Sequence, residues 1–229
     1  MKIKSLFLTL PLLSLVGWST YSSSNPTVGS SSWYKKEISA IQSQANNISA
    51  EALKTGLTAY IKARQSGMSQ KQFLTIIDYS KPSTKRRLWV IDVKNEKVLF
   101  NTWVSHGKNS GEVNATSFSN QPGSLKSSFG VFKTTSETYM GHNGYSLRLK
   151  GLEQGINDKA YERAIVIHGA WYATQEVARQ HGTLGRSWGC PAISKEIAKP
   201  LINTIKNGSL VVAYYPNQKW LRNSTFLAG

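Results

Sequence analysis

The sequence predicts a mainly β domain of the β-rich α+β type, a sandwich or barrel with a few helices. From about residue 85 onward, short runs rich in β-branched and aromatic residues alternate with Gly, Asn and Ser, a pattern typical of strands joined by turns. Clear helical spacing is confined to one segment near residue 50 and another near residue 200. With 229 residues, 40% of them hydrophobic, the chain can build a core without a metal or a disulfide.

The first residues have the outline of a signal peptide, expected over 1–22. Lys2 and Lys4 precede a short apolar run, 6–16, and small residues follow it. The run is shorter than the roughly 20 apolar residues of a membrane span, so no stable span is expected after signal cleavage. A lipid anchor would need a cysteine at the cleavage point, and the only cysteine is at position 190. We therefore expect an exported protein in which 23–48 is a linker or N-terminal segment that continues into polar sequence able to form a helix.

The main domain is expected over 49–218, beginning with a helix. Ser49 can cap this helix, and apolar residues recur at helical spacing up to about Gln65, before Gly67 offers a stop. A second short helix is expected to include 70–73.

Six strands and a further helix are expected in the rest of the domain. The strands are 88–93, 98–104, 130–134, 145–149, 164–167 and 210–215. Between the last two, apolar residues at helical spacing predict a helix over 193–207, with Ser194 as its cap. Residues 219–229 are expected to form a C-terminal tail.

The chain is strongly basic, with 28 Lys and Arg against 12 Asp and Glu and a formal net charge of +16. The excess is spread along the sequence and favours polyanionic surroundings, such as nucleic acid, anionic lipid or an acidic cell wall. No basic helix or base-stacking motif accompanies it, so nucleic-acid binding is not expected. Four scattered histidines and one cysteine lack ligand spacing, so neither a metal nor another cofactor is expected.

Cys190 is the residue on which the functional interpretation depends. A single cysteine in an exported chain cannot form an intramolecular disulfide and must persist as a free thiol. Inert burial is the usual explanation for such a residue. Here a buried strand, 164–167, leads into His168, and a polar loop leads through Gly189 into Cys190. Because an imidazole can take the thiol proton and stabilise the thiolate, this arrangement predicts a Cys–His acyl-transfer site.

Residues around the pair have expected supporting roles. No acidic residue lies in the loop, so the carbonyl of Gly169 is expected to orient the second nitrogen of His168. The N–H groups of Gly189 and Cys190 are candidates for an oxyanion site, and Ser187 for a hydrogen bond within the loop or to the substrate.

Five further residues are candidates for substrate binding. Arg186 can grip a carboxylate with two parallel hydrogen bonds, with a structural contact to a backbone carbonyl as the alternative. Trp188 and Tyr145 are expected to form a wall of the cleft, with core packing as the alternative. His106 and His142 lie in glycine-rich segments and are expected either to line the cleft or to hold their loops by hydrogen bonds.

The motifs around the pair resemble the signature of the L,D-transpeptidases, the YkuD-type cell-wall enzymes. His-Gly at 168–169 is followed, after a gap, by Ser-x-Gly-Cys at 187–190. The resemblance runs from about Ala50 to Pro216. Its most specific parts are similar to the murein L,D-transpeptidase catalytic-domain branch and occupy 105–111, 118–120, 128–132, 144–153 and 186–192.

This resemblance implies a β-rich L,D-transpeptidase-type catalytic fold and a thiolate that attacks the L-to-D peptide bond of a peptidoglycan tetrapeptide stem. Terminal D-alanine leaves, and the acyl group passes to an amine, either of a second stem, giving a 3-3 crosslink, or of an acceptor protein. It implies Cys190 as the nucleophile, His168 as the base, Gly169 as the orienting carbonyl, Ser187 as a loop partner and Gly189 as part of the oxyanion site. The expected location is the periplasm or the cell-wall space.

Two positions depart from the commoner signature, which has His in place of Trp188 and Asn or Arg in place of Ala192. The acceptor is therefore left open, and the sequence does not indicate the oligomeric state. An L,D-carboxypeptidase, in which water replaces the amine, would share the same acyl-enzyme. A catalytically silent wall-binding protein is an alternative of a different class, and the intact Cys–His pair argues against it. Papain-like peptidase chemistry is disfavoured by the β-rich context and by the order of His before Cys.

Overall fold

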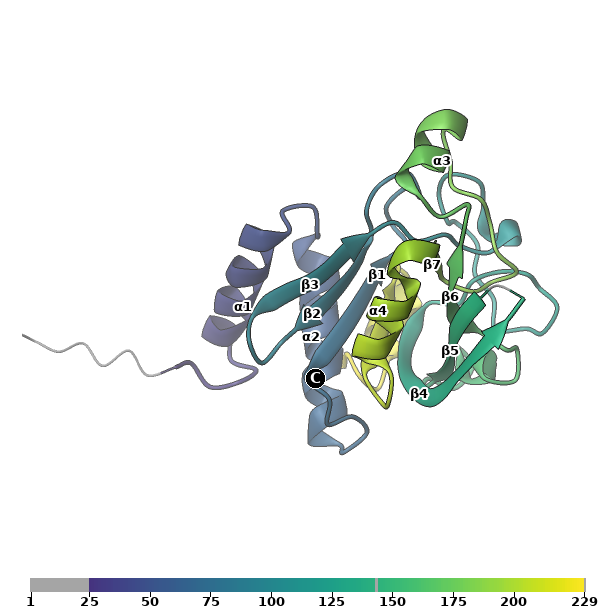
Figure 1. The fold of residues 1–229 in the computed structure, drawn as a ribbon. Coiled ribbons are helices and arrows are strands. Elements are labelled where there is room, and N and C mark those ends of the chain that lie inside the picture. The colour runs from purple at the N-terminus through teal and green to yellow at the C-terminus, as the bar shows by residue number, and fades with distance from the viewer. Residues whose placement is uncertain (1–24, 143, 229) are drawn as a thin grey trace, which may run out of the picture.

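The computed structural model describes residues 25–142 and 144–228, so the expected signal peptide lies outside the described residues. Within this part of the chain, one eight-stranded sheet has the order β3-β2-β1-β8-β4-β5-β6-β7 (Figure 1). The strands are β1 (Phe73–Asp78), β2 (Leu88–Asp92), β3 (Lys97–Thr102), β4 (Gly130–Gly141), β5 (Gly144–Gly151), β6 (Val166–Ala170), β7 (Ala192–Ser194) and β8 (Leu210–Tyr214). The α-helices are α1 (Ser31–Gln44), α2 (Ala50–Gln65), α3 (Gln175–His181), α4 (Lys195–Ile205) and α5 (Gln218–Asn223).

The central strands are buried on both faces, because each face of the sheet packs against its own layer. Along β8, Leu210, Val212 and Tyr214 face one hydrophobic cluster, while Val211 and Ala213 face the other. Helices α1 and α2, together with Trp220 of α5, supply the first cluster. Helix α4 supplies much of the second and contacts β1, β5, β6 and β7 (Figure 1).

The two edges of the sheet are linked, so that it approaches a closed barrel. The chain beyond β3 forms an antiparallel bridge between Ser105 and Ala192 of β7, in which the Ser105 N–H donates to the Ala192 carbonyl at 2.8 Å. A second bridge joins Gly107 to Ser187. Sheet closure therefore brings 105–111 beside the loop that contains Cys190.

Most of the expected elements are present. The helix that follows Ser49 is confirmed as α2, whose Ala52 N–H donates to the Ser49 hydroxyl at 3.2 Å. All six expected strands and the expected helix over 193–207 are also present, the latter as α4. No helix in the described ranges is long and apolar enough to cross a membrane.

Several features differ from the sequence-based expectation, among them the short strand β7, which was not expected. The helix over 70–73 is wrong, because this stretch leads directly into β1, which pairs with β2 and β8. Strand β1 was missed because burial on both faces removes the alternation of polar and apolar residues. The segment 23–48 contains α1, held by buried Trp33 and Ile41. The tail 219–229 includes most of α5, whose Trp220 is buried.

Candidate active site

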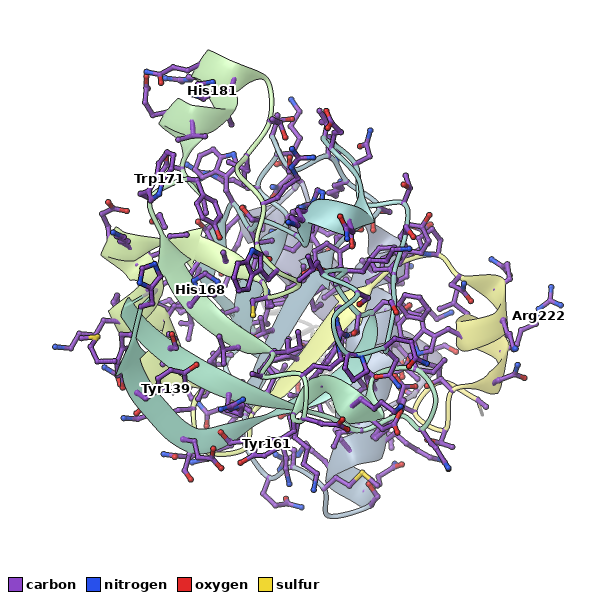
Figure 2. The ribbon with its side chains drawn as sticks, turned by 90° about the vertical axis from the view of Figure 1, so that its right-hand side faces the viewer. Tyr139, Tyr161, His168, Trp171, His181 and Arg222 are labelled. Atoms are coloured by element: carbon purple, nitrogen blue, oxygen red, sulfur yellow. The ribbon has the colours of Figure 1, made fainter. Side chains whose placement is uncertain are left out.

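Strand pairing brings His168 and Cys190 together. His168 lies in the middle of β6, which pairs in parallel with β7 so that His168 stands opposite Ala192. The His168 N–H donates to the Pro191 carbonyl at 3.4 Å. Cys190 directly precedes Pro191, so its backbone position is fixed by the same ladder. In Figure 2, His168 lies between Trp171 and Tyr139 on one face of the molecule.

Both side chains line one cleft of about 470 Å³, which we call the catalytic cleft. The Cys190 Sγ is partly buried and lies 3.8 Å from the Ala164 carbonyl oxygen. The cleft is lined by Tyr139, His142, Arg163, Ala164, Val166, His168, Tyr172, Arg186, Ser187, Trp188 and Cys190. It therefore combines the thiol, the imidazole, two guanidinium groups and several aromatic rings.

The hydrogen bond expected between His168 and Gly169 is present, with 3.0 Å between the His168 Nδ1 and the Gly169 carbonyl oxygen. A carbonyl oxygen can only accept, so Nδ1 carries the proton and Nε2 has a free lone pair when the ring is neutral. Burial lowers the pKa of His168 below its usual value, and the Gly169 carbonyl partly opposes that shift. The imidazole at neutral pH is therefore a neutral base.

Two opposing influences act on the Cys190 thiol. Burial raises its pKa, whereas a hydrogen bond from the Val166 backbone and the charges of Arg163 and Arg148 lower it. Burial is the largest of these causes, so the thiol is predominantly protonated at neutral pH in the free protein. A thiolate at this site requires a base that accepts the proton as the reaction proceeds.

The loop from Ser187 to Cys190 is closed by its own hydrogen bonds. The Ser187 hydroxyl donates to the Cys190 carbonyl at 2.6 Å and accepts from the Gly189 N–H at 3.1 Å. In this conformation the Gly189 N–H donor is already used, and its role in an oxyanion site stays a prediction. Within 25–142 and 144–228, no acceptor pairs with the Cys190 N–H, which leaves it as the candidate oxyanion donor.

Gly189 lets the backbone pass close to the Lys126 carbonyl and the Arg163 side chain. Its φ is +120°, and a Cβ there would lie 2.7 Å from the Lys126 carbonyl oxygen and 3.4 Å from the Arg163 Nη2. Its own carbonyl accepts a hydrogen bond from the Ser127 hydroxyl at 3.0 Å. Glycine is required here by both conformation and space.

Arg163 is a site residue that the sequence did not reveal. Its Nη1 donates to the Ser119 carbonyl at 2.7 Å and the Ser128 hydroxyl at 2.6 Å, and its Nη2 donates to the Lys126 carbonyl at 2.6 Å. The guanidinium thus holds the neighbouring loop and places a positive charge beside Cys190. Arg163 lies outside the motifs that single out His168 and Cys190, and no local spacing distinguishes it from other surface arginines.

Three of the five candidates for substrate binding line the catalytic cleft, and two do not. Arg186, Trp188 and His142 line the catalytic cleft, and the Trp188 side chain is 76% exposed. Arg186 also forms an exposed ion pair with Glu112 at 3.0 Å, an arrangement that contributes about 0–1 kcal/mol.

The other two candidates do not line the catalytic cleft. Tyr145 packs against the core, and its hydroxyl donates to Asn203 of α4 at 3.1 Å. His106 is buried, its Nδ1 accepts from Arg87 at 2.7 Å, and its Nε2 donates to the Gly111 carbonyl at 3.1 Å. These contacts give both residues structural roles. The sequence did not indicate this, because local sequence cannot show which side of a loop faces the core.

A lone thiol and a neutral imidazole in one cleft have the arrangement of the Cys–His class of acyl-transfer sites. The sequence model of the L,D-transpeptidase catalytic-domain family matches residues 44–214, and the chain belongs to this family. Among solved structures, the chain is similar to the crystal structure of L,D-transpeptidase (Yku) from Stackebrandtia nassauensis. The identity is 14%, with 84% of this chain and 98% of that chain covered and a TM-score of 0.36. No curated protein matches the chain.

Proposed function

We propose that this protein is a peptidoglycan L,D-transpeptidase that uses Cys190 as its nucleophile. The observation that carries the proposal is the shared cleft of Cys190 and His168, with the His168 Nδ1 proton fixed by the Gly169 carbonyl. The family match supports a transpeptidase-type function on cell-wall peptides. The excess of basic residues favours retention in an anionic wall, and export to the periplasm or cell-wall space follows from this substrate.

In the first half-reaction, the Cys190 Sγ attacks the carbonyl carbon of the bond between the third and fourth residues of a tetrapeptide stem. The His168 Nε2 takes the thiol proton as the sulfur–carbon bond forms. The Cys190 N–H donates to the oxyanion of the tetrahedral intermediate. His168 then gives the proton to the departing amine, so that D-alanine leaves and a thioester remains.

In the second half-reaction, an amine attacks the thioester and its proton passes to the His168 Nε2. Collapse of the tetrahedral intermediate forms the new amide and expels the sulfur, which recovers the proton from His168. If water takes the place of the amine, the products are a tripeptide and the free thiol. The two outcomes share Cys190 and His168 and differ only in the acceptor.

Intact-protein mass spectrometry tests this proposal most directly. We expect the wild type to form a covalent adduct with a carbapenem and to release D-alanine from a disaccharide-tetrapeptide, and Cys190→Ala to do neither. His168→Gln should lower D-alanine release by about a hundredfold or more, since general-base catalysis contributes roughly 10²–10⁴-fold. Met68→Ala, at an exposed position just beyond α2 and away from the catalytic cleft, is the control.

The products identify the acceptor. A crosslinked dimer indicates transpeptidation, and a tripeptide alone indicates carboxypeptidase activity. A folded wild type that forms no adduct and no product would overturn the proposal in favour of a catalytically silent wall-binding protein.

A further inference from the structure

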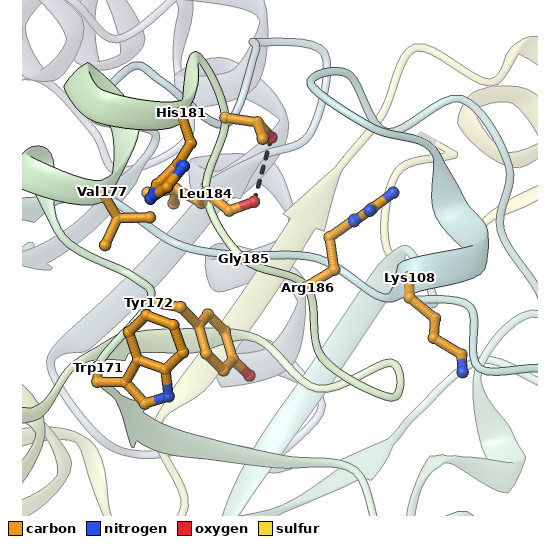
Figure 3. A pocket seen from close by; sticks show the side chains of 9 residues that line it. Lys108, Trp171, Tyr172, Val177, His181, Leu184, Gly185 and Arg186 are labelled. Carbon is orange, nitrogen blue, oxygen red and sulfur yellow. Dashed lines mark hydrogen bonds between the residues drawn. The ribbon is translucent and has the colours of Figure 1, made fainter.

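A second pocket of about 390 Å³ adjoins the catalytic cleft, and we call it the side pocket (Figure 3). Tyr172 and Arg186 line both cavities, so the two are neighbours. The rest of the side pocket is lined by Lys108, Trp171, Val177, His181, Thr183, Leu184 and Gly185. Neither half-reaction described above uses any of these residues.

The first wall of the side pocket is aromatic. Trp171 is 68% exposed and meets the Tyr172 ring edge to face, with ring centroids 5.8 Å apart. Among the tryptophans of the described residues, Trp33, Trp89 and Trp220 are buried, and Trp103 is half-buried. The two exposed ones, Trp171 and Trp188, line the side pocket and the catalytic cleft, respectively. Exposed indoles gathered at one site indicate a binding surface rather than a contribution to the core.

The opposite wall carries hydrogen-bond donors. Figure 3 shows Lys108 and Arg186 on the other side of the pocket from Trp171 and Tyr172, with the charged ends of both side chains directed away from Trp171 and the Tyr172 hydroxyl turned toward their side. Lys108 is exposed and presents an ammonium group. An apolar aromatic face opposite a few donors is suited to a ligand that is apolar on one face and rich in oxygen at its edge.

We infer that the side pocket binds a sugar ring of the glycan strand that carries the stem peptide. This inference rests on the proposed function. A pyranose ring presents C–H groups on its faces and hydroxyl or acetamido oxygens at its rim. The faces can stack on Trp171, and the oxygens can accept hydrogen bonds from Lys108, Arg186 and Tyr172.

The length of the stem agrees with this placement. The glycan joins the N-terminal end of the tetrapeptide, and the scissile bond precedes its last residue, so three residues separate the sugar from the reacting carbonyl. Three extended residues span about 10 Å, which suits a sugar held in a cavity that adjoins the catalytic cleft. The acyl donor would then occupy both cavities at once.

A comparison of two donors tests the inference. We would measure kcat/KM for D-alanine release from a disaccharide-tetrapeptide and from the free tetrapeptide. The wild type should prefer the glycosylated donor. Trp171→Ala should reduce that preference by severalfold to about tenfold while leaving the rate with the free tetrapeptide unchanged, in line with the energy of one aromatic contact. Lys108→Met should act in the same direction.

Met68→Ala is the matched control, because Met68 is also an exposed apolar residue but lies just beyond α2, away from both cavities. Equal rates of the two donors in the wild type would overturn the inference. So would a loss in Trp171→Ala that is the same for both donors. If Trp171→Ala alters only the ratio of crosslinked dimer to tripeptide, the side pocket holds the acceptor peptide, and the inference is likewise wrong.

A binding measurement separates this inference from the proposed function. Saturation-transfer NMR with the peptide-free disaccharide should show contact with Cys190→Ala and none with Cys190→Ala/Trp171→Ala. If the disaccharide contacts the protein but no D-alanine is released, the sugar site is supported and the proposed transpeptidase function is contradicted. Normal D-alanine release without sugar contact, and without preference between donors, would retain the transpeptidase and reject the sugar site.

Discussion

At Gly189 the absence of a side chain has consequences for the whole reactive loop. The φ of +120° and the 2.7 Å approach of a Cβ to the Lys126 carbonyl both oppose any larger residue. We expect Gly189→Ala to lower the unfolding free energy by about 1–3 kcal/mol and D-alanine release by at least about tenfold, because Cys190 moves with the loop. Thermal unfolding and product assays would measure both effects.

Gly67→Ala is the control for this substitution. Gly67 also has a positive φ, of +72°, but a Cβ there would meet no atom within 4 Å. It should cost stability without affecting D-alanine release. If Gly189→Ala released D-alanine as fast as the wild type, the loop would not need this conformation.

His106 makes the stability of the protein depend on pH. Burial and, less strongly, the charge of Arg87 lower the pKa of His106 to about 4, against 6.5 for the unfolded chain. Between these values the unfolded chain binds a proton that the folded protein does not, so stability falls as the pH decreases from about 6.5 to 4. The full difference corresponds to about 3 kcal/mol.

Urea denaturation at several pH values would reveal this dependence. His106→Gln should flatten the slope between pH 6.5 and 4, and His181→Gln, at an exposed position, should leave it unchanged. An unchanged slope in His106→Gln would assign the acid sensitivity to other groups.

The sequence alone was sufficient to predict the position of residues whose side-chain chemistry few other residue types can supply. The sequence predicted that the Cys190 thiol and the His168 imidazole lie together and that His168 bonds to the Gly169 carbonyl, since few residue types can make a Cys–His pair. Their catalytic roles belong to the proposed function. The sequence was insufficient for His106 and Tyr145, whose partners, Arg87 and Asn203, are distant along the chain. Only the folded arrangement shows that these two side chains do not line the catalytic cleft.

At the scale of elements, one side chain makes several of the hydrogen bonds that hold the segment 119–128 beside the site. Arg163 bonds to the Ser119, Lys126 and Ser128 positions of this segment, and its charge also lowers the pKa of the Cys190 thiol. A lysine would keep the charge but lose the forked geometry, whereas a methionine would lose both. The two substitutions therefore separate anchoring from electrostatics.

We expect both Arg163→Lys and Arg163→Met to speed amide hydrogen exchange across 119–128. Only Arg163→Met should markedly slow the alkylation of Cys190 by iodoacetamide at pH 7, because loss of the charge raises the thiol pKa. Equal alkylation rates for the two variants would show that the charge of Arg163 does not reach the thiol.

Elements with strong local signals were predictable, and those defined by tertiary packing were not. Helix α4 has a continuous apolar stripe, and α2 has a cap and regular spacing. Strand β1 lacks alternation, and the three-residue β7 exists because it pairs with β6. Helix α1 has a largely polar sequence and is fixed by burial of a few residues.

At the scale of the whole molecule, the segment that contains α5 covers one side of the core and is hydrogen-bonded to Glu153. This buried carboxylate accepts from the Val131 N–H at 2.6 Å and from the Trp220 Nε1 at 3.0 Å, and also from the Ser224 hydroxyl. Trp220 also packs in the cluster formed by α1 and α2. Residues near the end of the chain thus complete a core that begins with α1.

Trp220→Phe should keep most of this packing but leave the carboxylate without one donor, lowering the unfolding free energy by about 1–3 kcal/mol. Trp220→Ala should cost about 3–5 kcal/mol. Chemical denaturation of the two variants would separate the hydrogen bond from the packing. A Trp220→Phe protein as stable as the wild type would show that the indole N–H contributes nothing net.

The connection from β6 to β7 has a consequence for how such a protein diversifies. Parallel pairing of these strands fixes His168 against Pro191 and Ala192, while the chain between them must travel away and return, and on this excursion it carries Trp171 and α3. Its last part, 185–191, contains Cys190 and is tied to 105–108, whereas 171–184 can change in length and composition without disturbing that alignment. Exchange of 171–184 between homologues is therefore a route to altered substrate binding with the same Cys190 and His168.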